Sequence, residues 1–167
     1  RVEVATGAVT TLAGSGASGS ADGVGGAAQF YYPTGLAISP DGSALFVADL
    51  VNQKIRRVEV ATGAVCLWRT PPTKFSRPIG VAVSPDGSVL FVADFGGHKI
   101  RRVEVVTTVA GSGAEGSADG VGETGAVTTL AGSGAAGSAD GVGGAAQFNY
   151  PYGVTISPDS SALFVAD

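Results

Sequence analysis

The sequence predicts an all-β protein built of β-propeller blades, and three observations carry this prediction. The chain repeats itself, because residues 6–49 and 124–167 differ at only six of 44 aligned positions. Each repeat contains short apolar runs rich in β-branched residues, separated by turn residues. No segment has the 3.6-residue periodicity of a helix. Four short strands within about 45 residues are typical of one propeller blade.

Local chemistry places the strands of each repeat in order. Residues 35–39 are apolar and follow Pro33, a residue that suits the first position of a strand. Pro, Asp and Gly at 40–42 then favour a turn, because Pro fixes φ and Gly accepts a positive φ. The other predicted strands are residues 45–47, the more polar residues 55–60, and residues 9–12 with their copy at 127–130.

A second shift, of 45 residues, aligns SPDGSALFVAD at 39–49 with SPDGSVLFVAD at 84–94. We therefore expect residues 1–167 to form one partial propeller, with repeats at about 1–56, 57–101 and 102–167. Propellers typically have four to eight blades, and three blades do not close a ring. We expect completion by another copy of the chain or by residues outside it.

One repeat is irregular. GSADGVG at 116–122 is followed at once by ETGAVTTLAG, although a whole blade core follows the copy at 19–25. This predicts a missing blade core at Gly122–Glu123, which would leave the strand at 127–130 without a partner. Either a deletion has fused two loops, or connecting residues are absent from the sequence. The position inside a glycine loop favours the second explanation.

The chain resembles the NHL-repeat family in the pattern P-x-G-[LV]-A-[IV]-S-P-D-G-S-x-L-F-V-A-D-x-x-N-x-K-I-R-R-V, which begins at Pro33. The second repeat departs from it at Gly97 and the third at Ser160. The resemblance covers nearly the whole chain and implies four-stranded NHL-like blades, six in the complete ring. It implies no single function, because propellers serve many unrelated ones. The structural residues of the motif are Gly35, Asp41, Asp49, Gly80, Asp86, Asp94, Gly153 and Asp167.

Composition excludes some classes of partner. The net charge is −4, and the ten Lys and Arg residues are scattered, whereas nucleic-acid binding needs clustered cations. No apolar run approaches the ~20 residues of a membrane span. We therefore expect no nucleic-acid partner and no membrane span. Low charge with abundant Gly, Ala and Ser favours an extracellular or cell-surface location.

No residue pattern indicates catalysis or metal binding. His98 is the only histidine, and the only cysteine, Cys66, has no partner histidine on a recognisable motif. The Gly/Asp loops around Asp119 and Asp140 offer too few carboxylates for calcium, so we interpret them as flexible connectors between blades. The sequence thus predicts a chain that is not an enzyme and that holds no metal or cofactor.

The carboxylates at Asp49, Asp94 and Asp167 follow the same strand in every repeat. We interpret them as acceptors of backbone N–H bonds in the following turn; the alternative is that they line a ligand channel. The arginines of the third strand are predicted to be solvated or paired with glutamates of that strand. These residues are Arg56, Arg57, Arg101 and Arg102, with Glu59 and Glu104.

The amino-acid sequences of the near-identical repeats differ just before the innermost strand, at 31–34, 76–79 and 149–152. Exposed tyrosines at this mouth of the channel would stack on a sugar or a peptide. The alternative is that Phe30, Phe75 and Phe148 wedge between blades and the tyrosines cover them. A hydrophobic segment at 66–72 replaces one glycine loop and marks a second contact surface. The candidate contact residues are Tyr31, Tyr32, Trp68, Arg77, Tyr150 and Tyr152.

The leading functional hypothesis is a non-enzymatic structural or interaction module of a repetitive extracellular or surface protein. It would recognise a protein or a glycan, or self-associate as a homo-oligomer or as the subunit of a fibre. The alternative is a ligand-binding or lyase-like NHL propeller whose active site lies in blades absent from this chain. Tyrosines, rather than charged residues or histidines, distinguish the repeats, and this favours recognition.

Overall fold

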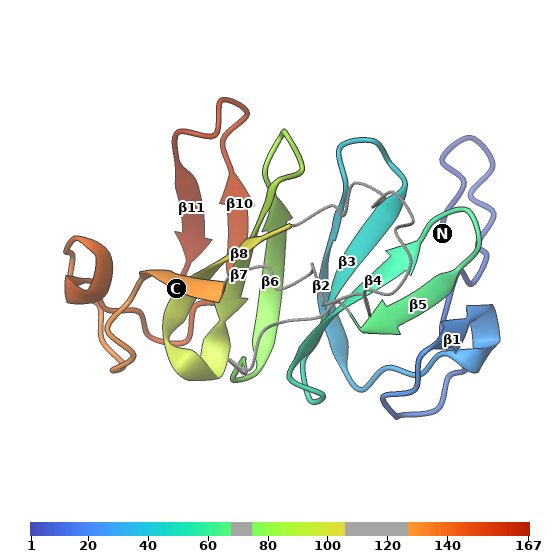
Figure 1. The fold of residues 1–167 in the computed structure, drawn as a ribbon, viewed down its shortest axis with the longest axis horizontal. Coiled ribbons are helices and arrows are strands. Elements are labelled where there is room, and N and C mark those ends of the chain that lie inside the picture. The colour runs from blue at the N-terminus through green and yellow to red at the C-terminus, as the bar shows by residue number, and fades with distance from the viewer. Residues whose placement is uncertain (68–74, 106–126) are drawn as a thin grey trace, which may run out of the picture.

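The computed structural model describes residues 1–67, 75–105 and 127–167, and it places three antiparallel sheets side by side (Figure 1). The first sheet has the order β1–β5–β4–β3–β2, the second β6–β7–β8–β9, and the third only β10–β11. The strands are β1 (Gly23–Val24), β2 (Pro33–Ile38), β3 (Ala44–Asp49), β4 (Lys54–Glu59), β5 (Ala64–Leu67), β6 (Pro78–Val83), β7 (Val89–Asp94), β8 (Lys99–Glu104), β9 (Val127–Ala131), β10 (Gly153–Ile156) and β11 (Leu163–Ala166).

The only helical elements among the described residues are three short 3-10 turns, η1 (Gly25–Ala27), η2 (Phe95–Gly97) and η3 (Gly143–Ala145). None of the helices in the described ranges is long and apolar enough to cross a membrane. The prediction of an all-β chain is confirmed. The strand predicted to follow Pro33 begins at Pro33 itself.

The turn between the first two strands of each repeat is built by one aspartate. Asp41 accepts hydrogen bonds from Ser39 Oγ at 2.5 Å and from the backbone N of Ser43 at 3.1 Å. Asp86 and Asp159 make the same bonds with the serines beside them. These hydrogen bonds, led by the one from the preceding serine, lower the pKa of each aspartate to about 2.

The sheets pack against each other through alternate residues of β3 and β7. Phe46 of β3 lies in a buried cluster with Phe75, Leu90 and Val103. Its neighbours Leu45 and Val47 point to the opposite face of the first sheet, because side chains alternate along a strand. That opposite face has no fourth sheet against it among the described residues, and Leu36 on β2 is 62% exposed there.

Glycines let the innermost strands approach each other. A Cβ on Gly35 would overlap the carbonyl oxygen of Ile79, and one on Gly80 would lie 2.8 Å from the carbonyl oxygen of Tyr152. Strands β2, β6 and β10 therefore lie next to each other backbone to backbone, which no larger residue would allow at these positions.

The sequence repeats and the sheets are out of phase. The predicted repeat boundary at 56/57 falls inside β4. Residues 9–12 do not form the predicted strand; Val9 makes an isolated bridge with Val2 instead. A short turn closes this bridge, in which the backbone N of Gly7 donates to the carbonyl oxygen of Glu3 at 2.7 Å. The third sheet contains only β10 and β11.

The irregular repeat gives a different result from the one expected. The predicted junction at Gly122–Glu123 lies outside the described residues, as do Trp68 and Asp119. The strand that follows the junction, β9, pairs with β8 in the register Val103↔Val127. The prediction that the strand at 127–130 lacks a partner is wrong. The free edge of β8 offers the same backbone groups that β4 offers to β5, so β9 completes the second sheet.

The two described glycine loops are tied down rather than flexible. The backbone N of Gly14 donates to Gly25 at 3.0 Å, and that of Ser15 to Ala28 at 2.9 Å. Residues 132–146 repeat both bonds at 3.0 and 2.9 Å. The interpretation as flexible connectors is corrected, because each loop satisfies its backbone groups in the same way.

Candidate functional site

A buried aspartate of β3 and a buried arginine of β4 form an ion pair in the first sheet. Asp49 and Arg56 are both fully buried and form an ion pair of 3.1 Å. Asp49 also accepts hydrogen bonds from the backbone N of Tyr31 at 2.7 Å and from Asn52 Nδ2 at 2.8 Å. The carboxylate therefore has both oxygens occupied and is part of the framework of the blade.

Arg56 in turn holds the glycine loop onto the sheet. Its guanidinium donates to the carbonyl oxygens of Gln29 and Ala21, each at 3.0 Å, and to Asp22 Oδ1 at 2.5 Å. It also lies over the ring of Phe30, 5.3 Å from the centroid. The prediction that this arginine is solvated or paired with Glu59 is wrong, because the loop encloses it.

The same aspartate position is used in the other sheets, with fewer partners. Asp94 accepts a backbone bond from Ser76 at 2.6 Å and lies 3.5 Å from Arg101. Burial raises the pKa of Asp94, against the effect of these two partners. Asp167 accepts the backbone N of Asn149 at 2.6 Å and is exposed.

These bonds correct the predicted partner of the aspartates. The backbone donors in all three sheets lie 18 residues before the carboxylate, in the segment that leads into the innermost strand. The following turn contributes the side chain of Asn52, which donates to Asp49. Each aspartate thus fixes the segments that carry the candidate tyrosines. Arg57 and Arg102 do pair with Glu59 and Glu104, as expected.

The predicted contact residues lie at the ends of the innermost strands. Tyr32 and Tyr152 are 69% and 61% exposed, and Arg77 is exposed at the position equivalent to Tyr32. Tyr31 and Tyr32 stack on each other with centroids 5.5 Å apart. Trp68 lies outside the described residues. The structure therefore brings these candidates to one face, but in two separate groups.

The second group is an aromatic cluster that joins two sheets. Phe95 lies 4.8 Å from Tyr150 and 6.1 Å from Tyr152, between ring centroids. The ring of His98 lies 4.6 Å from that of Tyr150, and its Nδ1 accepts the backbone N–H of Tyr150 at 3.3 Å. We call Phe95, His98, Tyr150 and Tyr152 the aromatic cluster. Figure 1 shows the third sheet, which carries the tyrosines, beside the second.

Sequence reasoning found the tyrosines of this cluster and missed Phe95 and His98. A signal was present, because Phe95 and His98 stand where the first repeat has Leu50 and Gln53. The ring of Tyr150 packs at a tilt against the rings of Phe95 and His98. The alternative, in which tyrosines cover Phe30, Phe75 and Phe148, stays a prediction.

The backbone of this face is strained. Tyr32, Arg77 and Tyr150 have φ values of 54°, 58° and 65°, and Gln53 and His98 have 57° and 51°. Residues other than glycine rarely adopt this left-handed region, and such conformations gather at functional sites. At Tyr32 and Tyr150, this conformation sets the direction in which the side chain leaves the backbone.

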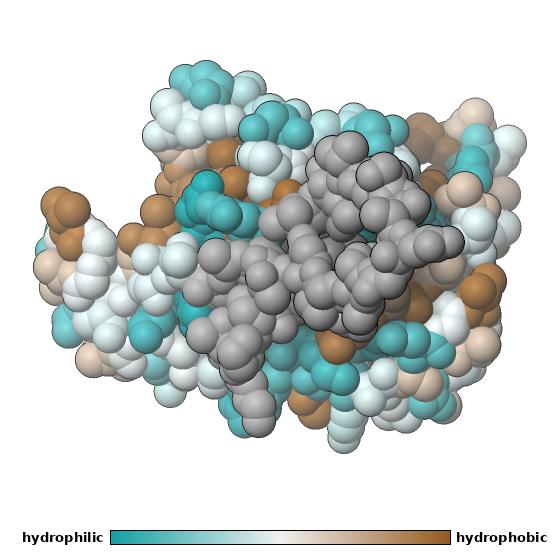
Figure 2. Space-filling view, in the orientation of Figure 1, coloured by the Kyte–Doolittle hydropathy of each residue, from teal (hydrophilic) through white to brown (hydrophobic). Residues whose placement is uncertain are grey.

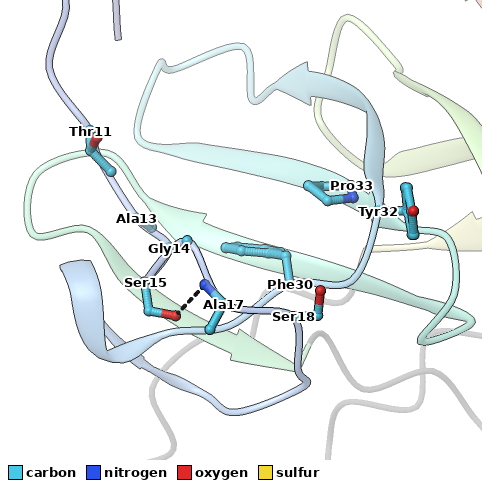
Figure 3. A pocket seen from close by; sticks show the side chains of 10 residues that line it. Thr11, Ala13, Gly14, Ser15, Ala17, Ser18, Phe30, Tyr32 and Pro33 are labelled. Carbon is cyan, nitrogen blue, oxygen red and sulfur yellow. Dashed lines mark hydrogen bonds between the residues drawn. The ribbon is translucent and has the colours of Figure 1, made fainter.

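A groove of about 630 Å³ opens between the first glycine loop and the start of β2 (Figure 3). Phe30, Tyr32 and Pro33 line one side of it, and the loop residues 13–18 line the other. A smaller apolar pocket of about 170 Å³ adjoins it, lined by Leu12, Ala13, Phe30, Pro33, Leu45, Val47 and Val58. Among the described residues, no group of three His, Cys, Asp or Glu side chains is placed to hold a metal ion.

Solved structures similar to this one define the fold. A structural-genomics protein of unknown function from Bacteroides thetaiotaomicron superposes with a TM-score of 0.61 at 20% identity, over 81% of this chain and 32% of that one. A candidate gluconolactonase superposes with a TM-score of 0.54 at 19% identity, over 94% and 42% of the two chains. The fold is a partial β-propeller. The predicted fold class is confirmed.

Sequence comparisons do not assign the chain to a family. No protein-family model matches the chain. No curated protein matches it. The chain spans less than half the length of the similar structures.

The prediction that the chain is not an enzyme is corrected. Dihydro-heme d1 dehydrogenase NirN superposes with a TM-score of 0.51 at 15% identity, over 83% of this chain and 24% of that one. The candidate gluconolactonase is a second similar structure named for an activity. Propellers of this shape thus include enzymes, and the lack of a catalytic motif in the sequence does not exclude this chain from them.

Proposed function

We propose that the chain is a segment of an NHL-type propeller that recognises a glycan or a peptide through the aromatic cluster. The observation that carries this proposal is that residues which differ between the repeats lie together in the structure. Phe95, His98 and Tyr152 each depart from the residue found at the same position in the first repeat, and they meet in one cluster. Departures spread over two repeats would not converge if they served only the packing of each blade.

The NHL assignment is supported by the roles of its motif residues. Asp49 anchors the segment before the innermost strand, Asp41 builds the turn, and Gly35 allows close approach of the next sheet. These are structural tasks, and the bonds of the two aspartates recur in all three sheets. A motif that specifies a blade leaves the exposed ends of the strands free to vary with the ligand.

The chemistry of the cluster fits a flat, partly apolar ligand. Tyrosine offers an apolar ring face and a hydroxyl group that remains hydrated, which suits stacking on a sugar ring or on a peptide side chain. His98 accepts a backbone bond at Nδ1, which leaves its Nε2 available to a polar group of the ligand. We place the protein outside the cell or at its surface, where such ligands are displayed.

Binding to a glycan array and to a peptide library, followed by titration in solution, tests this function. Tyr152→Ala is expected to weaken binding about tenfold, the effect of losing one aromatic contact worth about 1.4 kcal/mol. Phe164→Ala is the matched control, because Phe164 is also an exposed aromatic residue, at 62%, but lies on β11 away from the cluster. Its affinity should equal that of the unaltered chain.

Failure of both ligand classes to bind, or equal losses in the two variants, would contradict the proposal. Conversion of a bound ligand to a product during the titration would assign the cluster to an enzymatic propeller instead, with His98 as the first residue to replace.

A further inference from the structure

We propose that the ligand is an acidic glycan, a chain of linked sugars that carry carboxylate groups, bound along a row of three side chains. The row consists of Tyr32, Arg77 and Tyr150, one from each sheet, and we call it the mouth row. The proposal rests on the recognition function above and names its ligand class. The central residue is Arg77, which directly precedes β6 of the middle sheet.

The three members of the mouth row have the same backbone conformation. Their φ values are 54°, 58° and 65°, and each of them directly precedes a proline. The residue before each one donates its backbone N–H to the motif aspartate of its sheet, at 2.7, 2.6 and 2.6 Å. Tyr32 and Tyr150 are 69% and 49% exposed, and Arg77 is exposed too. The same anchor and the same conformation therefore turn the three side chains out of the backbone in the same way.

Contacts between the innermost strands bring the members of the row together. The hydroxyl group of Thr34 donates to the carbonyl oxygen of Ile79 at 3.1 Å. A Cβ on Gly80 would lie 2.8 Å from the carbonyl oxygen of Tyr152. Thr34, Ile79 and Tyr152 each follow a member of the row by two residues. Strand β6 lies between β2 and β10 (Figure 1), so Arg77 lies between the two groups of tyrosines.

Arg77 lies beside the aromatic cluster and has a free guanidinium group. The backbone N of Gly96 donates to the carbonyl oxygen of Ser76 at 2.7 Å, which places Arg77 next to the turn that begins at Phe95. Within residues 1–67, 75–105 and 127–167, no hydrogen bond or ion pair engages this guanidinium group. The other arginines of these ranges each pair with a carboxylate of the chain. Arg77 is therefore available to a carboxylate of a ligand, which its planar group can bind through two hydrogen bonds.

The two edges of the sheets differ in charge. The three aspartate turns lie at the top of Figure 1, and hydrogen bonds lower the pKa of their carboxyl groups to about 2. Figure 2 shows hydrophilic residues over these turns. Lys54 and Lys99 begin β4 and β8 at the opposite edge, where the mouth row lies. Of the motif aspartates at that edge, Asp49 and Asp94 are buried beside arginines, and Asp167 is exposed. An anionic ligand is therefore drawn to the edge of the row and repelled from the edge of the turns.

The extent of the row favours a chain of sugars over a single ring. Packed sheets lie about 10 Å apart, and the row spans three sheets. An acidic glycan presents apolar ring faces for the tyrosines and carboxylates for the arginine along one chain. A peptide would instead be held mainly through backbone hydrogen bonds to a strand edge, whereas the row contributes side chains.

Titration calorimetry with an oligogalacturonate and with its methyl ester tests the ligand class. The two probes have the same sugar rings, but the ester lacks the carboxylate charges. We expect the acid to bind about fivefold more tightly than the ester, which is the upper end for an exposed charge pair. Arg77→Gln should remove this preference and leave the affinity for the ester unchanged. Arg102→Gln is the matched control, because it removes the same charge from an arginine that pairs with Glu104 at 2.7 Å, so the preference should remain.

A second variant tests whether the ligand extends along the row. Tyr32→Ala should lower the affinity for the oligogalacturonate about tenfold, although Tyr32 lies outside the aromatic cluster. Phe164→Ala again serves as the control, since this exposed aromatic residue of β11 is not a member of the row.

Several outcomes would overturn the assignment of an acidic glycan: no binding of either probe, equal affinity for acid and ester, a preference that survives Arg77→Gln, or tighter binding of a polyglutamate peptide. The recognition function is judged separately. If the ester binds and Tyr152→Ala weakens its binding, the aromatic cluster recognises a glycan even where Arg77 makes no difference.

Discussion

At the scale of single residues, the fully buried Asp49–Arg56 pair connects three parts of the first sheet. Asp49 holds the segment before β2, and Arg56 holds the carbonyl groups of the glycine loop. A buried ion pair is costly to break from one side, because the remaining charge loses its partner without gaining water. The pair therefore makes the loop and the tyrosine segment depend on each other.

Asp49→Ala is expected to lower the free energy of unfolding by about 3–5 kcal/mol, since it leaves Arg56 buried beside one exposed carboxylate. Asp167→Ala removes the same motif residue where it is exposed and has no arginine partner in its sheet, and should change stability by less than about 0.5 kcal/mol. Urea unfolding of both variants measures the difference. Equal losses would show that the ion pair does not stabilise the blade.

The three turn aspartates are expected to make the fold less stable at low pH. Their pKa of about 2 lies below the ordinary value of 3.8, so the ionised form is favoured in the folded state. Their stabilising contribution is complete above about pH 4 and is lost as the pH falls from 3.8 toward 2. Ser39→Ala should raise the pKa of Asp41 toward 3.8, while that of Asp86 in the same chain stays near 2. Carboxyl carbon shifts in an NMR titration report both values, and an unmoved Asp41 would contradict this account.

At the scale of elements, the innermost strands depend on glycine. Gly35→Ala would force β2 away from the carbonyl group of Ile79, and we expect a loss of about 1–3 kcal/mol. Gly26→Ala is the control, because nothing lies within 4 Å of the added Cβ. Thermal unfolding compares the two. A Gly35→Ala chain as stable as the control would mean that β2 and β6 are further apart than described.

Most strands could be predicted from the sequence, because turn residues and β-branched runs recur at fixed spacing; residues 9–12 are an exception. The burial of Arg56 could not, since a charged residue on a polar strand looks solvated until a loop from 35 residues earlier covers it. The aromatic cluster was half predictable. Comparing residues 50–53 with 95–98 reveals Phe95 and His98, but only the fold brings them to Tyr152.

At the scale of the whole molecule, the offset between the sequence repeats and the sheets decides which segments meet. The predicted boundary at 56/57 falls inside β4, so one sheet contains residues of two repeats. The aromatic cluster also joins two repeats, because Phe95 and His98 follow β7 of the second sheet and Tyr150 and Tyr152 precede β10 of the third. A ligand at the cluster would therefore contact both sheets.

Amide hydrogen exchange of the chain with and without the bound glycan or peptide tests this account most directly. Bound ligand should slow exchange in residues 95–98 and 149–152, which carry the aromatic cluster, while β3 and β4 exchange as before. Unchanged exchange in both segments at saturating ligand, with slower exchange elsewhere, would contradict the account.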